Sequence, residues 1–324
     1  MRAMAWFANV PHRPPARSHP MNSASIAEVA SAFPWFFPLC AFAVGACVGS
    51  FLNVVIYRVP KEESIVSPGS HCACGQPIKW HDNIPILSWL ALRGRARCCG
   101  RAFSIRYPFV ELLTALLFTA CWLQFTPLVA VCGWILLGSL VAATFIDLDH
   151  MIIPDVFTLG LAVVGVILSL CIPALHGQPG DYFVVASLRA GVASVQGVLL
   201  GSGLVLWIAL LAEAVLKKEA MGFGDVKFVG AIGAFCGWQG AVFAVFGGAL
   251  VGTVWFAIAW TWQKVSGKAS PVAPPSETPE GEPTALAFGA HVPFGPMLAI
   301  AGALYFLFFR TAVAAWFADV SVLF

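Results

Sequence analysis

The 324-residue chain has few charged side chains. Asp, Glu, Lys and Arg together make up 10% of its residues, whereas hydrophobic residues make up 59%. A soluble domain of this length does not need so much apolar surface, so the composition excludes an ordinary water-soluble enzyme. The solvent of this chain is therefore expected to be the lipid bilayer. We expect membrane lipid, and no nucleic acid, among its partners.

Several familiar patterns are also missing. The sequence offers no Ser-His or Cys-His pairing and no HExxH motif, which excludes the usual serine, cysteine and zinc hydrolase chemistries. No internal repeat of about 20–50 residues is apparent. The N-terminal residues carry three arginines without an adjacent apolar run, so they do not resemble a cleaved signal peptide. We predict that residues 1–33 are a disordered tail.

What the chain does have is a series of apolar runs, which predict an all-α polytopic membrane protein with about eight transmembrane helices. The short, Gly-rich run Val226–Trp238 is the weakest of them, and omitting it leaves seven. Small-residue spacings within and after it are expected to permit close helix packing. The predicted spans are Trp35–Tyr57, Pro108–Gln124, Leu128–Ile146, Val156–Leu175, Leu188–Leu216, Val226–Trp238, Ala241–Trp262 and Phe294–Phe309.

These runs divide the chain into a first transmembrane helix (34–57), a polar loop domain (58–107) and a larger membrane domain (108–324). A Pro-, Ser- and Glu-rich stretch at 264–290 is predicted to be a flexible linker. Eight of the 18 Lys and Arg residues lie in the loop domain, which places it in the cytoplasm by the positive-inside rule. Alternation of the spans then brings Asp147 and Asp225 to the same side.

Asp147 ends one apolar run and Asp225 begins another. A carboxylate beside hydrocarbon is costly, roughly 2.5–3.5 kcal/mol at a helix centre and less near the interface, so such residues are rarely incidental. Two carboxylates that meet cannot both ionise easily, and one charged and one protonated acid form a pair suited to hydrolysis. We therefore predict that Asp147 and Asp225 are catalytic.

Four further residues are expected to support this pair. Asp149 lies about 200° from Asp147 around a helix, and Asp155 follows Pro154 as a candidate helix cap. Gly222 and Gly224 leave the backbone before Asp225 open to an extended peptide. A solvated acidic turn and a capped helix start are the alternative interpretations of these two segments.

Four cysteines lie close together in the loop domain at positions 72, 74, 98 and 99. In a reducing cytoplasm they are more suited to a metal than to disulfides, and a tetrahedral zinc site is the candidate. The adjacent thiols of Cys98 and Cys99 are awkwardly placed to bind one ion together, so His71 or His81 could replace one of them. Reduced structural thiols are the alternative.

Six blocks of the sequence resemble the type IV prepilin peptidases, which are aspartic proteases of the GxGD group that also act as N-methyltransferases. The blocks are GSFLNVVIYRVP (49–60), WHDNIPILSWLALRGRARCCG (80–100), RYPFVELL (106–113), FIDLDHMIIPD (145–155), EAMGFGDVKFVGAIGAFCGW (219–238) and VPFGPMLAI (292–300).

The resemblance implies a multi-pass enzyme of the bacterial inner membrane whose catalytic pair is Asp147 and Asp225. Its substrates would be prepilins or pseudopilins, cleaved after a glycine at the cytoplasmic face. The new N-terminus would then be methylated with S-adenosylmethionine. Two other classes are compatible with the residues alone, namely a proton-coupled transporter that uses the two aspartates and a non-catalytic membrane assembly factor.

Overall fold

The computed structural model describes residues 23–178, 180, 182–217, 221–266 and 293–321. Within these ranges the fold is all-α, as predicted, and extended pairing is limited to two isolated bridges in the loop domain. The helices are α1 (Ser23–Ala32), α2 (Phe36–Arg58), α3 (Leu87–Ala91), α4 (Arg106–Gln124), α5 (Pro127–His150), α6 (Leu159–Cys171), α7 (Phe183–Leu216), α8 (Phe223–Ser266), α9 (Gly295–Leu304) and α10 (Arg310–Ser321). Short helical turns are η1 (Val59–Lys61), η2 (Trp80–Asn83), η3 (Asp155–Phe157), η4 (Pro173–His176) and the π-turn η5 (Tyr305–Phe309).

Among the described residues, 6 helices are long and apolar enough to cross a membrane. They are α2, α4, α5, α7, α8 and the run formed by α9, η5 and α10. The predicted span Val156–Leu175 corresponds to η3 and the short α6, and the two spans predicted between Val226 and Trp262 lie within α8. A polytopic membrane protein is therefore confirmed, whereas the count of eight remains a prediction.

Helix α8 is interrupted at Gly237, whose φ of 71° and ψ of −178° are not helical. Glycine adopts this backbone conformation without a Cβ clash. The limb 223–236 and the limb 238–266 run in opposite directions along α9. On the first limb, Gly224 lies beside Ile153, as does Gly295 at the start of α9, and Ile232 faces Gly302 farther along α9. On the second limb, Gly247 lies against Ala301 and Gly252 against Met297, nearer the start of α9. The interruption therefore returns the chain to the end of the bundle where Asp225 lies.

Two regions were predicted to be flexible, the N-terminal tail and the linker, and the structure describes only part of each. The end of the N-terminal segment, where we predicted a disordered tail, forms α1 (Ser23–Ala32), since its Ala- and Ser-rich sequence contains no helix breaker. Residues 1–22 lie outside the described residues. The predicted linker 264–290 begins in the last turn of α8, and its remainder also lies outside the described residues.

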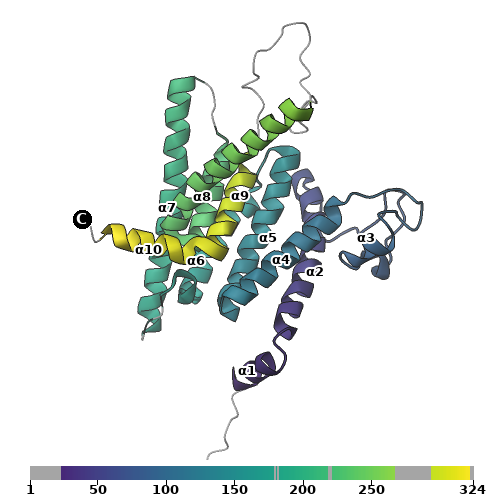
Figure 1. Cartoon of the computed structure of the whole chain (residues 1–324), viewed down its shortest axis with the longest axis horizontal. Helices are drawn as coiled ribbons and strands as arrows, with labels where there is room; N and C mark the ends of the chain where they lie inside the picture. Colours follow the sequence, from purple (N-terminus) through teal and green to yellow (C-terminus); the bar gives the residue numbers. More distant parts are fainter. Residues whose placement is uncertain (1–22, 179, 181, 218–220, 267–292, 322–324) are drawn as a thin grey trace, which may run out of the picture.

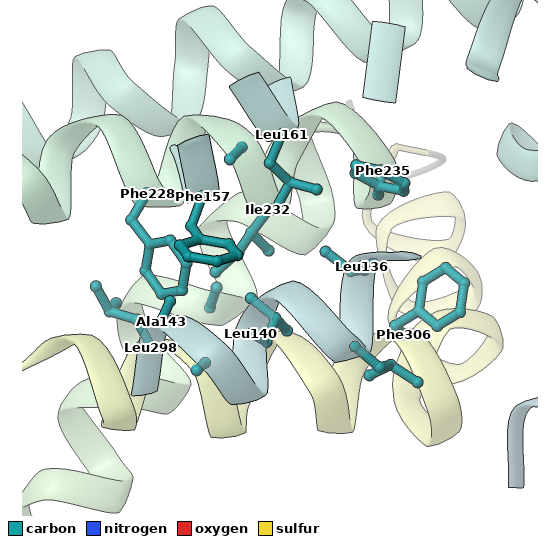
Figure 2. Close-up of a cluster of buried hydrophobic side chains, with 14 of the residues drawn as sticks. Leu136, Leu140, Ala143, Phe157, Leu161, Phe228, Ile232, Phe235, Leu298 and Phe306 are labelled. Carbon is teal, nitrogen blue, oxygen red and sulfur yellow. The ribbon is translucent and has the colours of Figure 1, made fainter. Parts of the chain in front are cut away.

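The helices form one bundle, from which the loop domain projects beside α2 and α4 (Figure 1). Figure 2 shows the core, where side chains from α5, α6, α8 and α9 meet. Glycines allow the closest approaches: a Cβ on Gly197 of α7 would lie 2.0 Å from the carbonyl oxygen of Gly233 on α8. This confirms the expected role of the small-residue spacings in helix packing.

The loop domain is connected to the bundle by buried polar contacts. Arg58, at the end of α2, is buried and donates hydrogen bonds to the carbonyl oxygens of Ser64 and Pro68. Glu111 of α4 is also buried and accepts a 2.7 Å hydrogen bond from the backbone N–H of Ile86. Unpaired buried charges are costly, so the Arg58 bonds hold the segment 64–68 against the end of α2, and the Glu111 bond holds the start of α3 against α4.

Candidate active site

Asp147 lies in the last turn of α5 and is 5% exposed. Its Oδ2 accepts a 3.1 Å hydrogen bond from the backbone N–H of Gly295, at the start of α9. The first N–H groups of a helix have no partner within that helix, and its positive end favours an anion. The α5 helix ends directly afterwards at Met151, whose left-handed conformation turns the chain toward α6.

Asp225 is in the first turn of α8 and is less buried than Asp147. Its backbone N–H bonds to the carbonyl oxygen of Gly222, which forms a turn before the helix. A Cβ on Gly222 would lie 3.9 Å from the Asp225 carboxylate, so a side chain there would face the acid. The two glycines thus add no side chain on either side of Phe223, whose own side chain is exposed.

The two carboxylates come from the last turn of α5 and the first turn of α8, and both helices contact the turn η3. Ile153, in the segment between α5 and α6, lies between the start of α8 and the start of α9. A Cβ on Gly224 would be 3.7 Å from the Ile153 side chain, and one on Gly295 would be 3.0 Å from its Cδ1. The ends of α5, α8 and α9 thereby surround a shared acidic site. Ile153 and Gly295 had no assigned role in the sequence, although Gly295 belongs to the VPFGPMLAI block.

Asp149 points to a different partner from Asp147, as the helix geometry predicted. It forms a 2.7 Å ion pair with Arg106 at the start of α4. Arg106 also donates to the carbonyl oxygen of Phe145 and lies 4.8 Å from the centre of its ring. Asp149 therefore joins α5 to α4 and lies outside the site around Asp147.

Asp155 is held by Lys227, which follows Asp225 by two residues. Its carboxylate also accepts a 3.3 Å hydrogen bond from the Thr158 hydroxyl, across the start of α6. The ion pair ties the segment between α5 and α6 to the first turn of α8. The sequence indicated a cap at Asp155 but gave no sign of Lys227, because the two residues are 72 positions apart.

The four loop-domain thiols lie together. The Sγ atoms of Cys72 and Cys99 are 3.6 Å apart, those of Cys74 and Cys98 are 3.4 Å apart, and all four lie within 4.8 Å of one another. Zinc bonds to sulfur at about 2.3 Å, so the sulfurs of a tetrahedral site are separated by about 3.8 Å. The arrangement fits zinc with four thiolates. The adjacent thiols of Cys98 and Cys99 are both included, each facing one thiol of the other pair.

Hydrogen bonds from the Cys74 backbone and from the Cys98 and Cys99 thiols lower the pKa of Cys72 to about 7. The same network raises the pKa of Cys98 to about 12, through its bonds with Cys72 and Cys74. The Cys72 thiol is thus readily available as a thiolate at neutral pH, and a bound metal would have to displace the proton of Cys98.

Next to the thiols, Asp82 is paired with Arg97 at 2.9 Å, and the guanidinium holds the pKa of Asp82 below its usual value. Asn53 of α2 donates a 3.1 Å hydrogen bond to the carbonyl oxygen of Tyr107 on α4, and such interhelical bonds satisfy polar residues within membrane spans.

The sequence was compared with known families and proteins. Residues 43–125 match the model of the bacterial peptidase A24 N-terminal domain, and residues 134–257 match that of the type IV leader peptidase family. A prepilin leader peptidase/N-methyltransferase of Aeromonas salmonicida is 35% identical over 308 residues, which cover 85% of this chain and 92% of the relative. The chain belongs to the type IV leader peptidase family.

Other relatives with the same name support this assignment. One from Myxococcus xanthus is 41% identical over 239 residues, covering 68% of this chain and 65% of the relative. One from Xanthomonas campestris is 33% identical over 301 residues, covering 83% of this chain and 90% of the relative. No solved structure matches the chain. In this leader peptidase family member, the N-terminal match spans α2, the loop domain and α4, and the second match includes both Asp147 and Asp225.

Proposed function

We propose that this chain is an intramembrane aspartic endopeptidase that removes the leader of type IV prepilins or pseudopilins after a glycine, and then methylates the new N-terminus. The observation that carries the proposal is the placement of Asp147 and Asp225 at the ends of α5 and α8, with Ile153 between Gly224 and Gly295, in a chain of this family. The names of its relatives supply the substrate class and the second activity.

The proposed chemistry uses the two acids as a pair. One carboxylate keeps its proton while the other is ionised, because both charges together would repel in this partly buried site. The ionised acid takes a proton from a water molecule, which attacks the scissile carbonyl carbon. The protonated acid donates a hydrogen bond to the oxygen of the scissile carbonyl group. The glycines before Asp225 leave room for the substrate backbone to lie extended beside the acids.

We place the enzyme in the bacterial inner membrane, with its active site on the cytoplasmic side. The support is the distribution of basic residues, eight of which lie in residues 58–107. With this orientation, the short basic leader and the thiol-rich loop domain share one compartment. A reducing cytoplasm keeps the four thiols available to a metal.

For the second activity we propose S-adenosylmethionine as the methyl donor and a structural zinc ion at Cys72, Cys74, Cys98 and Cys99. A closed site with four thiolates has no open position for substrate, so the ion would hold the loop domain in shape. Through the Glu111 and Arg58 contacts, that shape is transmitted to α2 and α4.

The test follows the mass of a synthetic prepilin peptide incubated with the purified protein in detergent. Asp147→Asn and Asp225→Asn should each lower the cleavage rate by about 10²-fold to 10⁴-fold, the usual contribution of an acid or base. Asp319→Asn, which removes an exposed carboxylate from α10, is the matched control and should cleave at the unmodified rate.

A gain of about 14 mass units on the product, dependent on the methyl donor, reports the second activity. Cleavage that persists in both Asp147→Asn and Asp225→Asn would contradict the proposed catalytic pair. A protein that shows neither cleavage nor methylation, yet supports pilus assembly in both variants, would instead be an assembly factor.

A further inference from the structure

A cavity of about 440 Å³ lies where the ends of α2 and α5 meet the start of α4. Tyr57 and Lys61 contribute from α2 and η1, and Tyr107 from α4. Asp149 and His150 line it from the last turn of α5. Because Asp147 bonds to α9 while Asp149 pairs with α4, this cavity and the acidic site lie on different faces of the same helix end.

The cavity combines both signs of charge with aromatic surface. Arg106 is already engaged by Asp149 at 2.7 Å. The ammonium of Lys61 lies 3.4 Å from the centre of the Tyr57 ring, and within the described part of the chain it has no carboxylate partner. Two of the four tyrosines of the chain, Tyr57 and Tyr107, line the cavity. A ligand that brings its own carboxylate, a positive centre and a flat ring would match these groups.

S-adenosylmethionine has these groups. Its carboxylate can pair with the ammonium of Lys61, which contacts the Tyr57 ring but has no carboxylate partner within the described residues, and its purine can stack on a tyrosine ring. Its sulfonium and ammonium groups are attracted by aromatic faces and by the carboxylate of Asp149. Cavities that bind small molecules have volumes of roughly 300–1,000 Å³ and contain a few convergent polar groups, and this one falls within that range.

We propose that this cavity binds the methyl donor, an inference that rests on the proposed methyltransferase activity. The acidic site and the cavity share the end of α5, so the amine freed by cleavage has a short path around one helix to the donor. The amine nitrogen uses its lone pair to form a bond to the methyl carbon. The carbon–sulfur bond breaks with its electron pair left on sulfur, and the methylated amine releases one proton to water.

The experiment measures the affinity of the full-length protein in detergent for S-adenosylhomocysteine, by calorimetry. Lys61→Met removes the unpaired ammonium, and Ser104→Trp fills the cavity from the segment before α4. Each should weaken binding about tenfold or more, as expected for loss of one charge-assisted contact or of the space itself. Lys79→Met, an exposed lysine of the loop domain outside the cavity lining, is the matched control and should bind as the unmodified protein does.

A second measurement does not depend on variants. Ultraviolet cross-linking of radiolabelled S-adenosylmethionine to the unmodified protein, followed by peptide mapping, should label the segments that contain Tyr57 or Tyr107. Label confined to residues 69–102, or equal affinity in Lys61→Met, Ser104→Trp and the control, would overturn the site and leave the methyltransferase function standing.

Two further outcomes separate the site from the function. An unmodified protein that cleaves the prepilin peptide but binds no S-adenosylhomocysteine would overturn the proposed methyltransferase activity together with the site. Variants that lose affinity for the prepilin peptide, while keeping their affinity for S-adenosylhomocysteine, would show that the cavity receives the leader and not the donor.

Discussion

Gly295 determines how closely α9 can approach the carboxylate of Asp147. A Cβ at this position would lie 2.5 Å from Asp147 Oδ2 and 3.0 Å from Ile153 Cδ1. Either the carboxylate or the helix end would have to move, and the hydrogen bond from the Gly295 N–H would be lost or lengthened. The position of the candidate catalytic acid therefore depends on the absence of a side chain on a neighbouring helix.

We expect Gly295→Ala to lower the rate of prepilin cleavage by about 10²-fold, the effect of a displacement of about 1 Å in a catalytic group. The zinc content should not change, because the loop domain is remote from α9. Gly203→Ala, where a Cβ meets open space on α7, is the control and should cleave normally. Normal cleavage by Gly295→Ala would mean that the Asp147 carboxylate does not need this contact.

The four thiols give a second prediction at the scale of single residues. The purified protein should contain about one zinc ion per chain, and Cys74→Ala or Cys98→Ala should reduce this to near zero, because a tetrahedral site needs all four ligands. Elemental analysis of the purified variants measures it. Cys40→Ala removes an exposed thiol of α2 and should retain the ion.

If the zinc-free variants still methylate the cleaved peptide at the normal rate, the ion does not hold the methyltransferase region in shape. A protein without zinc, after growth in zinc-supplemented medium, would favour the alternative of reduced structural thiols.

The candidate site could be predicted only in part. Asp147 and Asp225 were found because an acid at the edge of an apolar run is conspicuous, and the cysteines because they cluster in the sequence. The partners Gly295 and Lys227 could not be found in this way, since each is specified by the packing of helices far apart in the chain. That Cys98 and Cys99 both belong to the cluster of four thiols could also be seen only in the folded loop domain.

At the scale of elements, α8 shows how one residue can divide a helix. Gly237 occupies a region of backbone space that is nearly restricted to glycine, and the chain reverses there. The carbonyl oxygen of Ala234, just before the interruption, accepts a 2.7 Å bond from the Ser194 hydroxyl of α7 and a 3.2 Å bond with His176. Polar side chains thus satisfy a carbonyl group near the point where the helix is interrupted.

Gly237→Ala should destabilise the protein by about 1–3 kcal/mol, the usual cost of a side chain in such a conformation. We expect a lower apparent melting temperature in detergent, followed by tryptophan fluorescence. Gly69→Ala, at a loop position with open space, should leave it unchanged. An unchanged melting temperature for Gly237→Ala would indicate that the two limbs of α8 can join in another way.

The elements themselves were largely predictable from the sequence. Long apolar runs located α2, α4, α5 and α7 to within a few residues, because a bilayer requires unbroken hydrophobic helices. The reversal within α8 was expected near Trp238, although the glycine responsible was not identified. Helix α1 was missed because residues 1–33 contain no strong apolar run of the kind that located the other helices.

At the scale of the whole molecule, the arrangement of the spans determines which compartment contains the chemistry. The ends of α5 and α8 that carry Asp147 and Asp225 are connected through Ile153, and the loop domain meets α5 through Arg106 and Asp149. Acidic site, cavity and thiols therefore belong to one end of the bundle. Whichever side of the membrane contains one of them contains all three.

A membrane-impermeant maleimide tests which side of the membrane this end of the bundle faces. In intact spheroplasts the exposed thiols of Cys74 and Cys98 should remain unlabelled, and they should react once the membrane is opened and bound zinc is removed with a chelator, if that end is cytoplasmic. Gln178→Cys, between α6 and α7, should react in intact spheroplasts, because the connection His176–Tyr182 contains no Lys or Arg of its own and is predicted to face outward. The opposite labelling pattern would reverse the orientation.

Asp147 and Asp149 are separated by one residue on a single helix, yet they contact α9 and α4. Their directions are consequently set by the rotational register of α5, about 100° per residue. Inserting one alanine near the middle of α5 would swing both carboxylates away from their partners without altering either residue. Peptide cleavage and methyl transfer would then fail together, so the length of this helix constrains both activities at once.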